Sequence, residues 1–403
     1  MYVQHLSLTH FRNYARLELD LPARIHILQG ENAQGKTNLL ESIYYLSTTK
    51  SPLAAADRQL MNWAADDEVI PHAEIRAEFV RGGELHTLAA ILVKEQAADG
   101  SEVEAVFRRQ LLLNGVPRRA ADVVGRLNVV LFLPQDIVLI SGAPGERRRY
   151  LDITLCQVDA AYLRALARYN RVMAQRNALL RQLREGHRGS GPSGGGELEY
   201  WDQQLIQAGG YILARRYWAV AELAGRSDEI QGALTGGQER LRLEYQSSVL
   251  ERIGVGRDTA AHGQLLDEAV WAERIRAALQ LARAEEHGRA VTVVGPHRDD
   301  LRFLLNGVDA TVYGSRGQQR TVALALKLAE VGLMAAQNGE MPVLLLDDVA
   351  SELDARRARY LLDTVSRAQQ VLITTTDLRD YGTDFVSEAM LWRVAAGTLT
   401  PMP

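Results

Sequence analysis

The strongest constraint on the fold is a phosphate-binding pattern near the start of the chain whose acidic partner comes only near its end. The stretch GENAQGKT, Gly30 to Thr37, follows the apolar run 25–28 and precedes apolar residues at helical spacing over 39–46. A strand, a glycine-rich loop and a helix in this order form a P-loop, whose backbone N–H groups surround phosphate oxygens. The pattern predicts a nucleoside triphosphate site, and a chance glycine-rich turn is the less favoured alternative.

Each residue of the P-loop has an expected role in binding. Lys36 is long enough to reach the β and γ phosphates, and the hydroxyl of Thr37 suits Mg²⁺. The other six positions surround the phosphates, namely Gly30, Glu31, Asn32, Ala33, Gln34 and Gly35. We therefore expect ATP and Mg²⁺ as ligands.

The acidic partner motif follows the apolar strand pattern 343–346. This is the Walker B arrangement, in which Asp347 coordinates Mg²⁺ and Asp348 orients or deprotonates the attacking water. In isolation, a buried strand followed by a helix-capping aspartate explains the same residues. Beside a P-loop, the catalytic interpretation is favoured.

The distance between the two motifs predicts the domain organisation. About 310 residues separate Lys36 from Asp347, far more than one compact nucleotide-binding core places between them. We expect an α/β ATPase head built from both chain ends, with a mainly helical arm domain inserted. The expected segments are an N-terminal lobe at 1–150, the arm at 151–288 and a C-terminal lobe at 289–403.

Local patterns place the smaller elements. Alternation at 74–79 and the apolar run 85–93 favour antiparallel strands, and the turn signals at 99–100, 114–115 and 306–307 favour hairpins. The expected arm has helices over 147–184, 198–224 and 263–286, a strand at 241–245 and a flexible glycine-rich tip at 186–196. Further strands are expected at 291–294, 301–305, 343–346 and 371–374.

A serine and a glycine precede a helix just upstream of the Walker B strand. Ser315, Gly317 and Gln318 stand at a helix N-terminus, which binds anions through its N–H groups and dipole. A simple helix cap with a loop glycine explains these residues equally well. With the two Walker motifs, however, the order resembles that of ABC-type ATPases, in which this signature binds the γ-phosphate across a dimer.

The ABC resemblance also assigns two further residues. Gln135, after the apolar run 129–133, is similar in position to the Q-loop glutamine that senses Mg²⁺ and the attacking water. Asp354, in the stretch 351–354, is similar to the D-loop residue that communicates across the dimer interface.

Three segments distinguish between the families of such ATPases. LSLTHFRNY at 6–14, PQDIVLISGAPGERRRYLD at 134–152 and GPHRDDL at 295–301 resemble the RecF family. The resemblance implies an ATP-dependent homodimer that binds single-stranded and gapped DNA, acts with RecR and RecO, and helps to load RecA. It also implies a weak ATPase that acts as a switch, with DNA stimulating hydrolysis. Arg12 would touch the phosphates, although an ordinary surface ion pair is equally plausible.

Several charged residues have two interpretations. Arg164, Arg168 and Arg171 share one helical face in an acid-free window of six arginines, the others being Arg176, Arg181 and Arg184. They form either a DNA-phosphate stripe or a solvated face. We interpret the Arg147–Arg148 pair as a structural ion-pair element with Asp152 rather than as a DNA contact. We interpret His297 as a structural histidine rather than as a metal ligand.

Two departures from the ABC pattern bear on the activity. Asp348 replaces the usual glutamate, and its shorter side chain reaches water less easily, which favours slow hydrolysis. The strand that ends near Thr374 is followed by Asp377 without the histidine that transporters carry. A threonine there, or Asp377, is the expected substitute for contact with the γ-phosphate.

Composition excludes some classes of protein. The net charge of −4 gives no overall support for nucleic-acid binding, so any basic surface must be local. The single cysteine, Cys156, and the lack of a signal-like start or membrane-length apolar run predict a soluble cytoplasmic protein. The remaining alternatives are an SMC-like or Rad50-like tether, for which the arm is short, a transporter ATPase subunit and a nucleotide-binding scaffold without hydrolysis.

Overall fold

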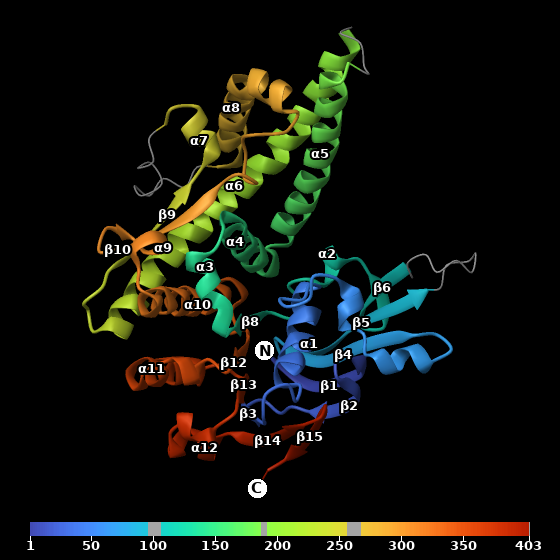
Figure 1. Ribbon diagram of the computed structural model, residues 1–403, viewed down its shortest axis with the longest axis vertical. Coiled ribbons are helices and arrows are strands. Elements are labelled where there is room, and N and C mark those ends of the chain that lie inside the picture. Colours follow the sequence, from blue (N-terminus) through green and yellow to red (C-terminus); the bar gives the residue numbers. More distant parts are fainter. Residues whose placement is uncertain (96–105, 187–191, 256–266, 403) are drawn as a thin grey trace. The chain divides into compact units, whose positions relative to one another are not determined.

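The computed structural model describes residues 1–95, 106–186, 192–255 and 267–402 (Figure 1). It divides into two compact units, the first made of 1–136 and 330–403 and the second of 137–329. The first unit therefore joins both chain ends in one α/β body, as expected. The three-segment division at 150 and 288 remains a prediction.

The first unit contains a mostly parallel sheet in the order β15-β14-β3-β13-β12-β8. Its strands are β3 (Ile25–Gln29), β8 (Val129–Phe132), β12 (Val343–Asp347), β13 (Val371–Thr375), β14 (Met390–Ala395) and β15 (Thr398–Pro401). Strands β8 and β12 are buried throughout, as their continuous apolar sequences require for a sheet covered on both faces. Only β13 separates β3, which leads into the P-loop, from β12, which ends in Asp347.

The second sheet of this unit is antiparallel, in the order β2-β1-β4-β5-β6-β7. Its strands are β1 (Tyr2–Phe11), β2 (Tyr14–Asp20), β4 (His72–Arg81), β5 (Glu84–Glu95), β6 (Val106–Leu113) and β7 (Val116–Arg118). The predicted hairpin at 114–115 is confirmed, with both residues at positive φ between β6 and β7. The predicted turn at 99–100 lies outside the described residues.

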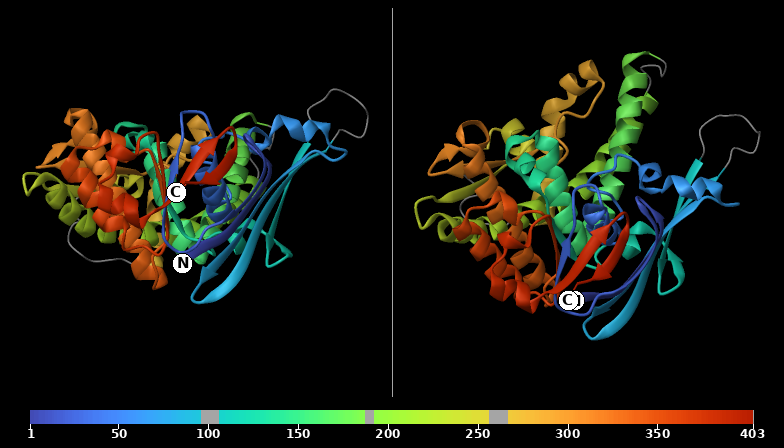
Figure 2. Two further views of the ribbon diagram at one scale, coloured as in Figure 1. Left: turned by 90° about the horizontal axis from the view of Figure 1, so that it is seen from below. Right: turned by 60° about the horizontal axis from the view of Figure 1, so that its bottom comes forward.

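Helix α1 (Lys36–Thr48) packs against strands of both sheets, and its apolar residues are buried. The hairpin β14–β15 lies against β2, as Figure 2 shows. The shorter helices of this unit are α2 (Ala120–Val123), α11 (Ala355–Val365) and α12 (Thr383–Glu388), with 3-10 turns at Asp57–Leu60, Trp63–Asp67, Pro134–Ile137, Ala350–Glu352 and Leu378–Asp380.

The second unit is mainly helical. Its helices are α3 (Val138–Ser141), α4 (Pro144–Val158), α5 (Ala160–Arg184), α6 (Pro192–Thr235), α7 (Ser248–Arg252), α8 (Glu268–Arg289) and α9 (Ala310–Tyr313). Helix α10 (Arg316–Asn338) begins here and ends in the first unit. Helices α5 and α6 lie side by side (Figure 1). The predicted helix 147–184 is therefore two helices, because Asp159 caps α5 by accepting from two of its N–H groups.

A three-stranded sheet in the order β11-β10-β9 completes the second unit. Its strands are β9 (Leu241–Gln246), β10 (Asp300–Leu305) and β11 (Val308–Asp309), which confirms the predicted strands at 241–245 and 301–305 and the hairpin at 306–307. Of the predicted flexible tip at 186–196, residues 187–191 lie outside the described residues, but 192–196 belong to α6, so the helix predicted at 198–224 begins earlier than expected. The start of the predicted helix 263–286 also lies outside the described residues.

The predicted strand at 291–294 is wrong. These residues form no ladder because side chains satisfy their backbone groups instead. The N–H of Thr292 donates to Asn177, the N–H of Val293 donates to Glu286, and the carbonyl of Thr292 accepts from Arg298. Across the described residues, no helix combines the length and the apolar character needed to span a bilayer.

Candidate nucleotide site

The P-loop presents an anion-binding surface made of backbone and one ammonium group. Lys36 is buried and donates to the carbonyls of Gly30 at 2.5 Å and Glu31 at 3.0 Å. Burial lowers its pKa, while Asp348 and Asp347 act in the opposite direction. Within the described chain, the N–H groups from 33 to 37 have no acceptor. Unpaired N–H groups beside a lysine fit a triphosphate.

Residues just after β1 hold the P-loop from one side. The side-chain amide of Asn13 donates to the carbonyl of Gln34, and the hydroxyl of Tyr14 donates to the carbonyl of Gly35, each at 2.9 Å. Tyr14 is fully buried. Sequence reasoning singled out the FRNY stretch only as a family resemblance and missed this role.

The hairpin β14–β15 holds the P-loop from another side. The backbone N–H of Ala396 donates to the side chain of Gln34 at 2.7 Å, and the N–H of Gly397 donates to its carbonyl at 3.1 Å. A Cβ atom on Gly30 would lie 2.3 Å from the carbonyl oxygen of Val394. Sequence reasoning missed the hairpin because nothing local links residue 397 to residue 34.

The two Walker motifs meet although 310 residues separate them. The hydroxyl of Thr37 lies 2.9 Å from both carboxylate oxygens of Asp347. Thr374, at the end of β13, donates to Asp347 at 2.7 Å. Thr374 therefore orients the Walker B carboxylate. A carboxylate and a hydroxyl placed together are oxygen ligands that fit Mg²⁺.

Asp348 occupies an unusual backbone position beside this pair. Its φ is 50°, and its N–H is held by the carbonyl and the hydroxyl of Thr374. Among the described residues, its buried Oδ1 atom has no hydrogen-bond partner. Burial raises the pKa of the carboxyl group. A buried carboxylate oxygen without a partner fits a group that binds water or a cation.

The other residues expected at this site differ in what surrounds them. Gln135 is exposed and follows β8, which pairs with β12, so it lies at the same sheet edge as Asp347. Arg12 forms a two-pronged ion pair with the buried Glu41, both contacts at 2.8 Å, which fits the ion-pair alternative. Asp354 caps α11 by accepting from the N–H of Arg357. Asp377 pairs with Arg379.

Ser315 and Gln318 lie together in the second unit, at the start of α10. The N–H of Gln318 donates to the Ser315 hydroxyl oxygen at 3.2 Å, and the N–H of Ser315 donates to Gln318 Oε1 at 2.9 Å. This reciprocal pair is a capping box. Gly317 is exposed between them. We call Ser315–Gln318 the signature turn.

Comparison with known proteins decides the family. The model of the RecF/RecN/SMC N terminal domain matches residues 2–383. DNA replication and repair protein RecF of Chloroflexus aurantiacus is 45% identical over 401 residues, which cover 98% of this chain and 99% of that protein. RecF of Chloroflexus aggregans is 46% identical over 403 residues, with 99% of each chain covered.

The chain belongs to the RecF family. A solved structure of the recombination mediator protein RecF with ATP is 28% identical, with a TM-score of 0.83 over 100% of this chain and 98% of the other. The Smc head domain of Pyrococcus furiosus is 15% identical, with a TM-score of 0.51, and shares the fold alone.

The two internal segments with RecF-family character meet in the second unit. Arg147 pairs with Asp300 at 2.7 Å, and Arg148 donates to the backbone carbonyl of Asp299 at 2.8 Å. Arg147 therefore forms a structural ion pair, but with Asp300 rather than with the predicted Asp152, and Arg148 contacts a backbone carbonyl instead of a carboxylate. Asp152 instead accepts from Arg216 at 2.7 Å.

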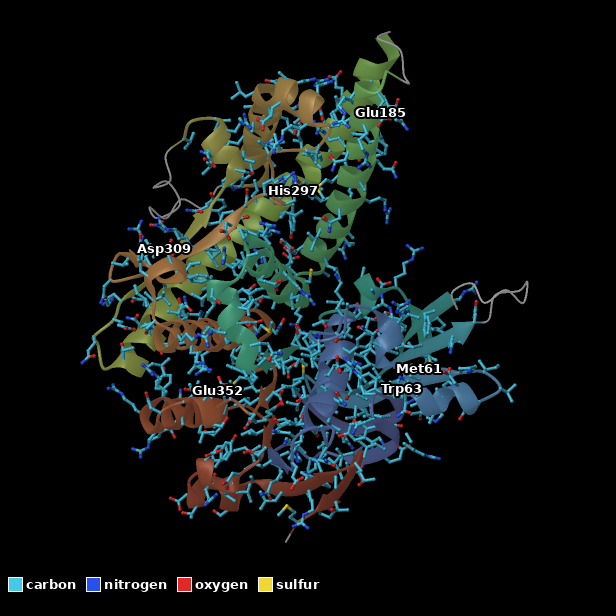
Figure 3. All side chains as sticks on the ribbon, viewed as in Figure 1. Met61, Trp63, Glu185, His297, Asp309 and Glu352 are labelled. Atoms are coloured by element: carbon cyan, nitrogen blue, oxygen red, sulfur yellow. The ribbon has the colours of Figure 1, made fainter. Side chains whose placement is uncertain are left out.

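His297 of the RecF-family GPHRDD motif is a satisfied structural histidine, as predicted. It lies against α5 (Figure 3), where its Nδ1 accepts from the hydroxyl of Tyr169 at 2.8 Å. Its Nε2 donates to the carbonyl of Thr292 at 3.1 Å. Burial lowers its pKa to about 4, so the neutral ring persists at neutral pH.

The arginines of α5 divide into two groups in this RecF-family chain. Arg164, Arg168 and Arg171 are exposed, and within the described part of the chain none of them pairs with a carboxylate. Arg176 is buried and is not available to DNA. It contacts Asp202 at 2.7 Å and Glu286 at 2.6 Å.

Proposed function

We propose that this RecF-family chain is an ATP-dependent DNA recombination and repair protein that pairs as a homodimer when ATP binds. The single observation that carries the proposal is the hydrogen-bonded meeting of Thr37 and Asp347 next to the unpaired N–H groups of the P-loop. ATP bound to a similar RecF structure supports the choice of nucleotide.

Binding follows from the chemistry of the P-loop. The N–H groups from 33 to 37 donate to phosphate oxygens, and the Lys36 ammonium exchanges two backbone carbonyls for phosphate oxygens. Thr37 and Asp347 would hold Mg²⁺, with Gln135 at the same sheet edge. The cation would neutralise charge on the phosphates.

Asp348 is the proposed residue for hydrolysis. Its unpartnered Oδ1 would accept a hydrogen bond from the attacking water, and would thereby orient the water or take its proton as the water attacks the γ-phosphate. The aspartate side chain is one methylene shorter than glutamate, so we propose slow turnover that suits a switch. DNA would stimulate this hydrolysis.

The second copy would complete the site. In our proposal the signature turn of one copy donates to the γ-phosphate bound by the other, and Asp354 communicates across the interface. The exposure of Ser315 and Gly317 supports this role. The N-terminal end of α10, where the turn lies, favours negative charge through the helix dipole.

DNA and the other proteins of the pathway are the proposed partners. Single-stranded and gapped DNA would bind the exposed face of Arg164, Arg168 and Arg171, and RecR and RecO would cooperate in loading RecA. Replacing Arg164 and Arg171 by glutamine should weaken DNA binding for all sequences and reduce the salt slope by about two. An unchanged slope, equal to that of Arg379→Gln, would place the DNA elsewhere.

The proposal is tested by the mass of the protein in solution. Sedimentation velocity should give a monomer without nucleotide and a dimer with ATP, the dimer persisting longest for Asp348→Asn. Lys36→Ala should remain monomeric. A monomer under every condition, including Asp348→Asn with ATP, contradicts the proposal.

A further inference from the structure

We infer that Glu239 is a positioning residue that fixes the hydrogen-bond polarity of the signature turn, so that the Ser315 hydroxyl keeps its proton for a phosphate oxygen. The inference rests on the proposed function, in which this turn completes the ATP site of a second copy. It adds a residue that lies outside every motif recognised in the sequence.

The Ser315 hydroxyl takes part in the capping box only as an acceptor. Its oxygen accepts from the N–H of Gln318, so its own O–H is not consumed by the capping box. The N–H of Ser315 is occupied by Gln318 Oε1. The turn is therefore left with a hydroxyl donor at an exposed position.

This arrangement requires one orientation of the Gln318 amide. If the amide were reversed, its NH₂ group would face the N–H of Ser315, and the capping box would break. Glu239 selects the orientation, because Gln318 Nε2 donates to Glu239 Oε1 at 2.9 Å. A carboxylate accepts and does not donate, so it excludes the reversed amide.

Glu239 is itself held by the end of α6. Its second oxygen, Oε2, accepts from Nε2 of the buried Gln231 at 2.7 Å. Its backbone N–H donates to the Thr235 hydroxyl at 3.3 Å. Gly236 and Gly237, both at positive φ, turn the chain from α6 to Glu239. A continuous series of hydrogen bonds thus runs from the interior of the second unit to Ser315.

The first experiment separates nucleotide binding from pairing. Glu239→Ala should leave ATPγS binding to the dilute monomer unchanged, because the P-loop is intact. It should weaken ATPγS-driven pairing, measured by sedimentation velocity across protein concentrations, by about tenfold. Glu229→Ala removes the same charge from an exposed position on α6 and should pair as the wild type does. Wild-type pairing by Glu239→Ala would overturn the inference.

A double-mutant cycle tests whether Glu239 acts through Gln318. Gln318→Ala should weaken pairing, and adding Glu239→Ala should weaken it no further. If the two substitutions instead weaken pairing additively, Glu239 has a structural role that is independent of Gln318, and the inference is overturned.

Glu239→Gln keeps the shape of the side chain and covers the case in which the alanine variant does not fold. Its amide can present NH₂ to Gln318 and permit the reversed orientation, so we expect an intermediate loss of pairing. Pairing equal to the wild type for this variant would overturn the inference.

Ser315→Ala separates failure of this inference from failure of the proposed function. If Ser315→Ala pairs normally, the proposed site shared between copies fails. If Ser315→Ala pairs more weakly than the wild type while both Glu239 variants pair as the wild type does, only the inference about Glu239 fails.

Discussion

The P-loop and the signature turn are held in different ways. The P-loop is held through its main chain by three separate segments: the residues after β1, the end of β13 and the hairpin β14–β15. The signature turn has a main-chain bond of its own, from the N–H of Gln319 to the carbonyl of Ser315, but the N–H of Ser315 depends on the side-chain amide of Gln318 and on the Glu239 carboxylate behind it. Main-chain contacts from several segments are redundant, whereas a single side-chain relay is not.

The same contrast separates the two units. The backbone around the P-loop packs so closely that glycine is needed at Gly30 and Gly35, where a Cβ atom would meet other groups. In the second unit, buried polar side chains hold the structure together, and Arg176, Arg216 and Asp299 are fully or almost fully buried. Truncating one buried side chain should therefore lower the free energy of unfolding more in the second unit than at the P-loop. Adding one methyl group should lower it more at the P-loop than in the second unit.

The largest effect is expected at Arg176. Arg176→Ala leaves the carboxylates of Asp202 and Glu286 without their buried partner, so the free energy of unfolding should fall by about 3–5 kcal/mol. Chemical denaturation followed by circular dichroism measures the loss. Arg164→Ala, exposed on the same helix, should change it by at most about 0.5 kcal/mol. Equal losses would show that the buried ion pairs of Arg176 do not stabilise the second unit.

The next largest effect is a pH dependence of folding stability that arises from Asp299 and His297. Burial raises the pKa of Asp299 to about 6, so between pH 4 and 6 the folded chain keeps a proton that the unfolded chain releases. Stability from Asp299 therefore falls as the pH rises. Burial lowers the pKa of His297 to about 4, so stability from His297 falls as the pH drops below 6.5. Each shift is worth up to about 3 kcal/mol, and the two responses oppose one another.

Variants separate these two responses. Over pH 4–6, the thermal midpoint of Asp299→Asn should rise more steeply with pH than that of the wild type. The midpoint of His297→Gln should rise less steeply or fall. Parallel pH profiles for all three proteins would contradict the burial argument.

Gly30→Ala tests the main-chain packing around the P-loop. The added methyl group meets the backbone carbonyl of Val394 at 2.3 Å, and a backbone atom cannot rotate away. We expect a loss of about 1–3 kcal/mol in unfolding free energy together with weaker ATP binding in titration calorimetry. Gly225→Ala, in open space on α6, should be neutral or stabilising. A neutral Gly30→Ala would show that β14 yields easily.

The smallest effect is expected from Tyr14→Phe. This change removes one of the several hydrogen bonds that hold the P-loop, so it should cost about 1 kcal/mol of stability or less. ATP affinity should fall by less than the tenfold loss of pairing expected for Glu239→Ala. A larger fall in affinity would mean that the contacts to the P-loop are not redundant.

Local patterns predicted much of the fold and most of the residues that the structure brings together in the candidate nucleotide site. The P-loop, the β12 strand with Asp347 and the two Asn-Gly hairpins each follow from contiguous residues whose local preferences match the final structure. The meeting of Thr37 with Asp347 fits the expected Walker pair, because β3, β13 and β12 are parallel and bring their carboxyl ends to one sheet edge.

Long-range pairing could not be predicted from the same patterns. Arg176 stands four residues after Val172 and seven after Tyr169, on the buried face of α5, and this helical spacing separates it from the exposed arginines. Its partners Asp202 and Glu286 lie on other helices and do not follow from this spacing. Arg147 pairs with Asp300 rather than with the nearby Asp152, because the choice depends on how α4 meets β10. The β-branched residues at 291–294 led to a wrong strand prediction because side chains outside the segment, those of Asn177, Glu286 and Arg298, satisfy its backbone groups.

The central claim is that each ATP site uses the P-loop of one copy and the signature turn of another. The most direct test mixes Lys36→Ala chains with Ser315→Ala chains, each carrying a different fluorophore, and measures energy transfer with ATPγS. Neither variant should pair alone, but the mixture should form a heterodimer, because one of its two sites combines an intact P-loop with an intact signature turn. No energy transfer in a mixture whose wild-type counterpart pairs would contradict the claim.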